Sequence, residues 1–221
     1  MAEASAVADG VVCLHEDAHL LVLDKPAELL CVPGRGPDKQ DCLSARALQR
    51  WPDALVVHRL DQATSGLVLM ARSLQMQRAL GQAFAAQRVD KRYQAVVQGV
   101  PAGADGGWHA IDLPIAADWE RRPLRVVDPA HGKPSLTRWR CLPGAQADAQ
   151  RTRLELQPVT GRTHQLRVHL AAIGHPILGD ALYGTGSAQA QAARLLLHAC
   201  RLELTHPMHG GRLRVESPCP F

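Results

Sequence analysis

The chain has 221 residues, of which 46% are hydrophobic and 21% are charged, with a formal net charge of +4 at neutral pH. This composition excludes an intrinsically disordered protein and indicates a globular chain with a sizeable core. The apolar runs are too short to span a membrane and no apolar leader opens the chain, so we expect a cytoplasmic protein without a membrane partner. The six cysteines form no C-x-x-C pair, which argues against a zinc or redox framework.

The basic residues are unevenly divided, because 21 are Arg and only 4 are Lys. Arginine suits phosphate recognition and stacking on bases, which would indicate a nucleic-acid partner. A GC-rich genome would favour arginine codons for any function. Composition leaves both explanations open.

Taken in chain order, the predicted elements are mostly strands. Apolar runs between turn residues predict strands at 11–14, 20–23, 54–57, 67–71, 91–99, 133–141, 152–156, 194–204 and 213–215. Helical spacing of apolar residues predicts helices at 42–49, 74–88 and 164–173, with Asp41, Ser73 and Thr163 as N-caps. We therefore expect an α+β fold, a mixed and mostly antiparallel sheet with flanking helices. Residues 1–10 are expected to be a disordered N-terminus, and 11–221 a single domain.

One polar stretch interrupts two predicted strands. It reads His58-Arg59-Leu60-Asp61-Gln62-Ala63-Thr64-Ser65-Gly66, between the apolar runs 54–57 and 67–71. Loops held by a rigid scaffold often carry function, so we interpret this stretch as part of a site. The alternative is that Asp61 and Thr64 only bond backbone amides in a turn.

Four further segments of the chain matter for the site. They are Asp24-Lys25-Pro26, Lys91-x-Tyr93-x-Ala95-x-Val97-x-Gly99, Gly161-Arg162-Thr163-His164-Gln165-Leu166-Arg167 and the apolar run Leu195-Leu196-Leu197-His198-Ala199. Arg162 comes just before a predicted helix, where the positive end of the helix dipole disfavours a cation. That placement indicates an anionic partner for Arg162.

These segments, in this order, resemble the RluA family of pseudouridine synthases over nearly the whole chain, in its short form without an S4-like domain. The resemblance implies the pseudouridine synthase fold with a central catalytic cleft. It implies that Asp61 is the nucleophile, that Tyr93 lies under the target base and that Arg162 pairs with Asp61. It also implies that Leu196 and Leu197 line the pocket, and that no cofactor takes part.

The same resemblance implies an RNA partner, namely a tRNA anticodon stem-loop, a 23S rRNA stem-loop, or both. We expect a monomer whose substrate contacts include His58, Arg59 and Thr64. A second set of cations is expected to face RNA, with a solvated surface as the alternative. This set is Arg121, Arg122, Arg138 and Arg140. Glu28 departs from the pattern, because we would expect Gly after Lys25-Pro26-Ala27.

Two further questions concern metal binding and other functions. The histidines at 58, 164, 169 and 198 suggest a metal cluster, but His164 and His169 are five apart, unlike the i, i+4 pair of a metal-binding helix. We therefore expect structural histidines and no metal.

Two other functions make different predictions. A non-catalytic RNA-binding module would be expected to lack Asp61, Tyr93 or Arg162. A glycoside hydrolase would need a second acid beside Asp61, and only Asp53 or Asp90 could fold in as one.

Overall fold

The computed structural model describes residues 10–103, 106–142 and 150–221, which form two compact units. Of the described residues, the first unit contains those from 10 to 91 and from 199 to 220, and the second contains those from 92 to 198 together with 221. The expected disorder of residues 1–10 falls almost wholly outside the described residues. The expectation of one domain over 11–221 stays a prediction beside this division.

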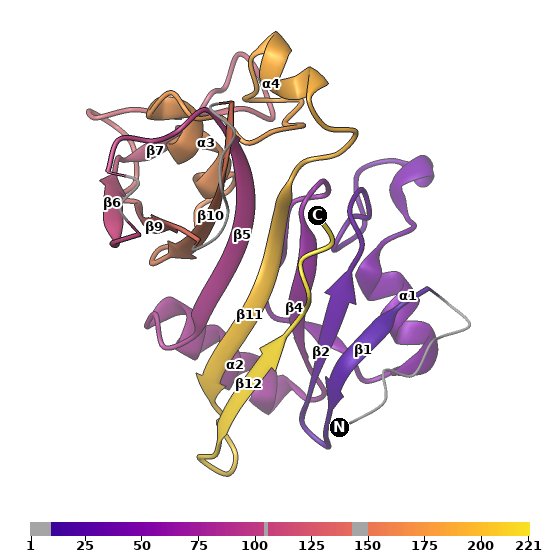
Figure 1. Cartoon of the computed structure of the whole chain (residues 1–221). Helices are drawn as coiled ribbons and strands as arrows, with labels where there is room; N and C mark the ends of the chain where they lie inside the picture. Colours follow the sequence, from indigo (N-terminus) through magenta and orange to yellow (C-terminus); the bar gives the residue numbers. More distant parts are fainter. Residues whose placement is uncertain (1–9, 104–105, 143–149) are drawn as a thin grey trace. The chain divides into compact units, whose positions relative to one another are not determined.

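The first unit is built on a sheet whose strands β1, β2, β4, β11 and β12 are hydrogen-bonded in that order, with β3 also pairing with β4 (Figure 1). The pairs β1–β2, β2–β4, β3–β4 and β11–β12 are antiparallel. The strands span Val12–Glu16 (β1), Leu20–Lys25 (β2), Leu55–Val56 (β3), Ser65–Ala71 (β4), Leu197–Thr205 (β11) and Arg212–Glu216 (β12). All seven residues of β4 are buried, which explains its unbroken apolar sequence after Gly66.

Two helices, α1 (Leu43–Arg50) and α2 (Leu74–Ala85), belong to this unit, with a short 3-10 helix at Pro37–Lys39. The predicted cap of α2 is confirmed, because the Met76 amide donates to Ser73 Oγ at 3.2 Å. The predicted Asp41 cap of α1 is wrong. Cys42 is the N-cap, and its Sγ accepts from the Ala45 amide at 3.4 Å. Asp41 instead binds the Arg46 guanidinium through two hydrogen bonds of 2.6 Å, because an exposed carboxylate gains more from a cation than from one amide.

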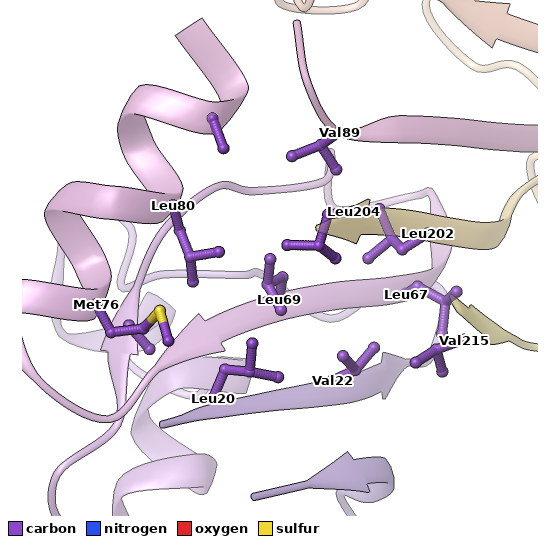
Figure 2. Close-up of a cluster of buried hydrophobic side chains, with 12 residues drawn as sticks. Leu20, Val22, Leu67, Leu69, Met76, Leu80, Val89, Leu202, Leu204 and Val215 are labelled. Atoms are coloured by element: carbon purple, nitrogen blue, oxygen red, sulfur yellow. The ribbon is translucent and has the colours of Figure 1, made fainter. Parts of the chain in front are cut away.

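The core of the first unit lies between α2 and the sheet (Figure 2). Met76 and Leu80 of α2 point toward β2 and β4, where Leu20 and Leu69 are fully buried. Leu202 of β11 continues the same cluster. The i, i+4 spacing in the sequence therefore identified the face of α2 that packs on the sheet.

The second unit has a four-stranded antiparallel sheet in the order β5, β10, β9, β6. Its strands span Asp90–Gln98 (β5), His109–Asp112 (β6), Leu136–Cys141 (β9) and Arg151–Pro158 (β10). A separate antiparallel pair joins β7 (Ile115–Ala117) to β8 (Arg125–Val127), and the helices are α3 (Gln165–Ala172) and α4 (Gly186–Ala190). The expected α+β class is confirmed.

Helix α3 packs on one face of β9. Gln165 Nε2 donates to Thr137 Oγ1 at 3.0 Å, and His169 Nδ1 lies 2.9 Å from the same hydroxyl. The predicted Thr163 cap is wrong, because the helix starts after His164, whose left-handed φ of 58° places it at the N-cap without a side-chain bond. Gly174 stands at the predicted C-terminal position with a φ of 83°. No helix in the described ranges is both long and apolar enough to cross a membrane.

Candidate active site

The loop that carries Asp61 is held at its backbone. The Leu60 amide donates to the thiol sulfur of Cys31 at 3.1 Å, and the Thr64 amide donates to the Asp61 carbonyl at 3.1 Å. Burial raises the pKa of the Cys31 thiol, so Cys31 stays neutral beside the loop. Leu60 and Thr64 are buried while Asp61 between them is half-buried, so the loop is anchored on both sides of the carboxylate.

A buried lysine fastens this loop to the preceding turn. Lys25, at the end of β2, is only 1% exposed. Its ammonium donates to the carbonyls of Pro26 at 2.8 Å, Leu29 at 2.7 Å and Gln62 at 2.9 Å. A buried ammonium is tolerated when its donors are satisfied, and here one of the acceptors is the residue after Asp61. The Asp24-Lys25-Pro26 segment therefore positions the Asp61 loop.

Glu28 stands where the family pattern predicts glycine, and the structure shows how the turn accommodates it. It has a φ of 63°, in the left-handed region that glycine adopts most easily. Its carbonyl accepts from Gln62 Nε2 at 3.2 Å. The turn therefore keeps the glycine-like conformation with a glutamate in place, at a cost of about 1–2 kcal/mol.

Two residues of the polar stretch 58–66 stabilise the position of β4. A Cβ at Gly66, whose φ is 110°, would lie 2.3 Å from the Ala199 carbonyl oxygen, so only glycine fits there. His58 Nε2 accepts from the Leu69 amide at 2.9 Å, and its ring lies 4.6 Å from that of Phe84. Burial lowers the pKa of His58 to about 3, with a smaller contribution from Lys91. Neutral His58 therefore supports β4, and its predicted contact with substrate stays a prediction.

In the second unit, Arg162 stands in the loop between β10 and α3. Its amide donates to Gln165 Oε1 at 3.0 Å, and the same oxygen accepts from Thr160 Oγ1 at 2.7 Å. Its Nε donates to the Pro134 carbonyl at 3.3 Å, and the residue is exposed. Gln165, which we did not predict as a site residue, thus sets the backbone of Arg162.

Tyr93 and the two predicted pocket leucines also belong to the second unit. Tyr93 is a half-buried residue of β5 and pairs with Leu156 of β10. Leu196 is half-buried against Val96 and Leu178, and Leu197 is buried. Asp61 belongs to the first unit, so the meeting of Asp61 with Tyr93 and Arg162 stays a prediction.

A buried ion pair at α3 was missed in the sequence. Arg167 and Asp180 have side chains that are 4% and 0% exposed, joined by hydrogen bonds of 2.8 Å and 2.6 Å. Burial alone would raise the pKa of Asp180, but Arg167 and the amides of Leu182 and Tyr183 outweigh it and hold that pKa below its usual range. The sequence does not identify Asp180 as the partner of Arg167, because Asp180 lies 13 positions further along the chain, beyond the end of α3.

His164 is fixed by the loop that contains Asp180. Its Nδ1 lies 2.7 Å from the Tyr183 hydroxyl, which also accepts from the Arg125 amide at 2.9 Å. The Tyr183 hydroxyl therefore links the His164 ring to the backbone of β8. His58, His164 and His169 each lie within hydrogen-bonding distance of a neighbouring group, and the absence of a bound metal stays a prediction. Among the described residues, no group of three or more His, Cys, Asp or Glu could hold a metal ion.

The four predicted RNA-facing arginines divide into two pairs. Arg121 binds Asp118 at 2.8 Å, and Arg122 stacks at 4.3 Å on Trp119, which is 71% exposed. On β9, Arg138 is exposed, whereas Arg140 binds Glu155 of β10 at 2.6 Å. Trp119 thus presents an aromatic ring at the surface of this loop, with the Arg122 guanidinium stacked on it.

Comparisons with known proteins agree with the geometry. The family model for RNA pseudouridylate synthase matches residues 19–172, which include Asp61, Tyr93 and Arg162. The chain is 42% identical over 211 residues to the dual-specificity RNA pseudouridine synthase RluA of Escherichia coli K12, covering 96% of this chain and 94% of the relative. It is 41% identical to RluA of Yersinia pestis, covering 96% of this chain and 100% of that one.

A solved structure supports the same fold. Human RNA pseudouridylate synthase domain containing 1 superimposes with a TM-score of 0.79 at 29% identity, over 98% of this chain and 86% of that one. The fold and the matched residues define an RNA pseudouridine synthase. Within that class, the chain belongs to the RluA family.

Proposed function

We propose that Asp61 is the catalytic nucleophile and that Arg162 and Tyr93 complete the active site. Asp61 is the only acid in its motif, and it sits in a loop tied down through Leu60 and Gln62. A nucleophile needs such a fixed position because misplacement of the reacting atom costs rate steeply. The motif match over residues 19–172 supports the two partners.

The chemistry needs these residue types. Pseudouridine formation breaks the N-glycosidic bond of uridine, rotates the base and closes a C-glycosidic bond. The base carbon loses a proton, and the ring nitrogen that held the sugar gains one. A carboxylate serves as covalent nucleophile at either the sugar carbon or the base, and both routes stay open. Arg162 keeps the carboxylate charged, and Tyr93 lies under the base and moves the proton. No group is oxidised or carried away, so the reaction requires no cofactor.

The target uridine has to leave its helical stack to reach Asp61. Arg59 is exposed two positions before Asp61. We propose that its guanidinium fills the gap left by the extruded base or grips the backbone beside it. Leu196 and Leu197 provide apolar lining, which favours a dry pocket around the reacting groups.

We further propose that the substrates are stem-loops of tRNA and of 23S rRNA. The observation that carries this proposal is the 42% identity, over 96% of this chain, to a relative named as a dual-specificity enzyme. The enzyme is then expected to act in the cytoplasm, where both RNAs lie, and as a monomer.

The test is a map of pseudouridines in cellular RNA with and without the gene, together with turnover on purified stem-loop transcripts. Loss of sites in both tRNA and 23S rRNA is expected in the deletion strain. Loss in one RNA class only would contradict dual specificity. Release of free uracil in place of pseudouridine would contradict the isomerase mechanism and favour a hydrolase.

Replacement of Arg162 is expected to lower turnover far more than stability. Arg162→Met removes the predicted counterion of Asp61 and should reduce kcat by about a hundredfold or more. Because Arg162 is exposed, we expect a loss of less than about 1 kcal/mol in unfolding free energy. Single-turnover kinetics and thermal denaturation measure the two effects. Arg162→Lys should recover little activity, because lysine lacks the fork geometry, and full recovery would contradict the paired arrangement.

RNA affinity is expected to fall steeply with salt, because arginine side chains neutralise phosphates and release counterions. Binding of a tRNA anticodon stem-loop should weaken by at least about tenfold between about 50 and 200 mM salt. Filter binding over this range gives the slope. A chelator should leave both affinity and turnover unchanged. A flat salt response would overturn phosphate-based binding, and a chelator-sensitive rate would indicate a metal.

A further inference from the structure

The second unit contains a pocket that the proposed chemistry does not use. Its volume is about 370 Å³. It is lined by Arg92, Trp108, His109, Ala110, Arg138 and Gln157. Across the sheet, Arg138 of β9 pairs with Ala110 of β6 on one side and with Gln157 of β10 on the other. The floor of the pocket is therefore a row across three adjacent strands.

The two arginines of this pocket lie on the sheet face opposite Tyr93. Tyr93 pairs with Leu156, and Leu156 pairs with Trp139, so these three side chains share one face. Successive residues of a strand point to opposite faces, which places Arg92 and Arg138 on the other side. Helix α3 packs on the sheet face that carries Thr137, and the face that carries Arg138 is the opposite one. The pocket is thus separate from the predicted position of the target base.

Trp108 organises the cations around the pocket. Trp108 is 41% exposed. The guanidinium carbons of Arg92 and Arg140 lie 4.9 Å and 4.7 Å from the centre of its ring. Stacking on an aromatic ring restrains an arginine and leaves its edge donors able to bind an anion. Glu155 binds Arg140, and the guanidinium-bearing residues that line the pocket itself are Arg92 and Arg138.

We propose that this pocket is an RNA contact outside the catalytic centre, which holds one phosphate group and its adjoining base. Arg92 and Arg138 bind the phosphate oxygens, and Trp108 offers its exposed ring to the base. Side-by-side cations and an exposed aromatic on an open sheet are the chemistry by which proteins bind unpaired nucleotides. The proposal rests on RNA being the substrate, and it adds a contact that keeps the RNA on the enzyme.

The experiment compares the affinities of matched variants. Trp108→Ala is expected to weaken binding of a short oligouridylate and of a tRNA anticodon stem-loop transcript by about tenfold. The double variant Arg92→Gln/Arg138→Gln should weaken it further and reduce the slope of log affinity against log salt by about 2. The control Arg78→Gln/Arg88→Gln removes the same charge from exposed residues of the other unit and should bind like the wild type.

A conservative variant separates stacking from folding. Trp108→Phe keeps an aromatic ring, so it should bind RNA within about threefold of the wild type. It should also lack the part of the fluorescence quenching by oligouridylate that comes from Trp108. Thermal denaturation shows whether each variant is folded. Wild-type affinity of Trp108→Ala for both RNAs, or an equal loss in the Arg78/Arg88 control, would overturn the pocket.

Failure of this proposal is distinct from failure of the proposed function. The wild-type enzyme is first assayed for pseudouridine formation on the stem-loop transcript. If no pseudouridine forms, the proposed substrate is wrong. If it forms while the pocket variants bind RNA like the wild type, only the pocket assignment is wrong.

Discussion

Asp61→Asn is expected to abolish pseudouridine formation, with a loss of turnover of more than about a thousandfold. The amide is nearly the same shape as the carboxylate but cannot act as the nucleophile. The loop should keep its place, because its anchors at Leu60 and Gln62 are backbone groups. RNA affinity should therefore stay within about threefold of the wild type, because phosphate contacts dominate affinity. Single-turnover assays and filter binding measure the two quantities.

A matched control tests whether any lost carboxylate in this region has the same effect. Asp53 is an exposed acid of the same unit, which binds Arg72 at 2.9 Å. Asp53→Asn should keep wild-type turnover and lose less than about 1 kcal/mol of stability. Substantial turnover by Asp61→Asn would refute the assignment of the nucleophile and would make Asp53 or Asp90 the next acid to test.

The largest effect on stability is expected at the buried pair Arg167–Asp180. Arg167→Met leaves the Asp180 carboxylate buried without its cation, which should lower the free energy of unfolding by about 3–5 kcal/mol. Chemical denaturation measures this loss. Replacing both partners by apolar residues should recover only part of it, because the amides of Leu182 and Tyr183 would lose their acceptor.

The pair Arg46–Asp41 provides a control of the same geometry. It also joins an arginine Nε and a terminal nitrogen to two carboxylate oxygens, but it lies at the surface. Arg46→Met should cost less than about 1 kcal/mol. Equal losses in Arg46→Met and Arg167→Met would show that burial does not determine the strength of the pair.

The buried pair Arg167–Asp180 also predicts a dependence of stability on pH. The folded-state pKa of Asp180 is lowered, so its contribution is fully present above the unfolded value of about 3.9. It fades as the pH falls through the lower folded value, because the folded carboxylate then takes up a proton. Denaturation between about pH 5 and 2 should show this loss in the wild type and a smaller one in Arg167→Met.

The sequence by itself determined the fold class, the family and most of the strands. The sequence of β9 alternates, and in the structure Thr137 and Trp139 are buried while Arg138 is exposed, since a strand has only two faces. Apolar spacing identified the buried face of α2, and Ser73 marked its start. These features depend on residues within a few positions of each other, so a linear pattern contains the information.

Tertiary structure decided which polar groups meet across the chain. Lys25 reaches the Gln62 carbonyl over 37 positions. Glu28 adopts a glycine-like φ that its residue type does not predict. The predicted caps at Asp41 and Thr163 were wrong. Asp41 binds the Arg46 guanidinium instead, and His164, with a left-handed φ, stands at the N-cap of α3 in place of Thr163. Such choices depend on which partner the fold brings within about 3 Å and on how much water it excludes, and neither is a property of a local stretch of sequence.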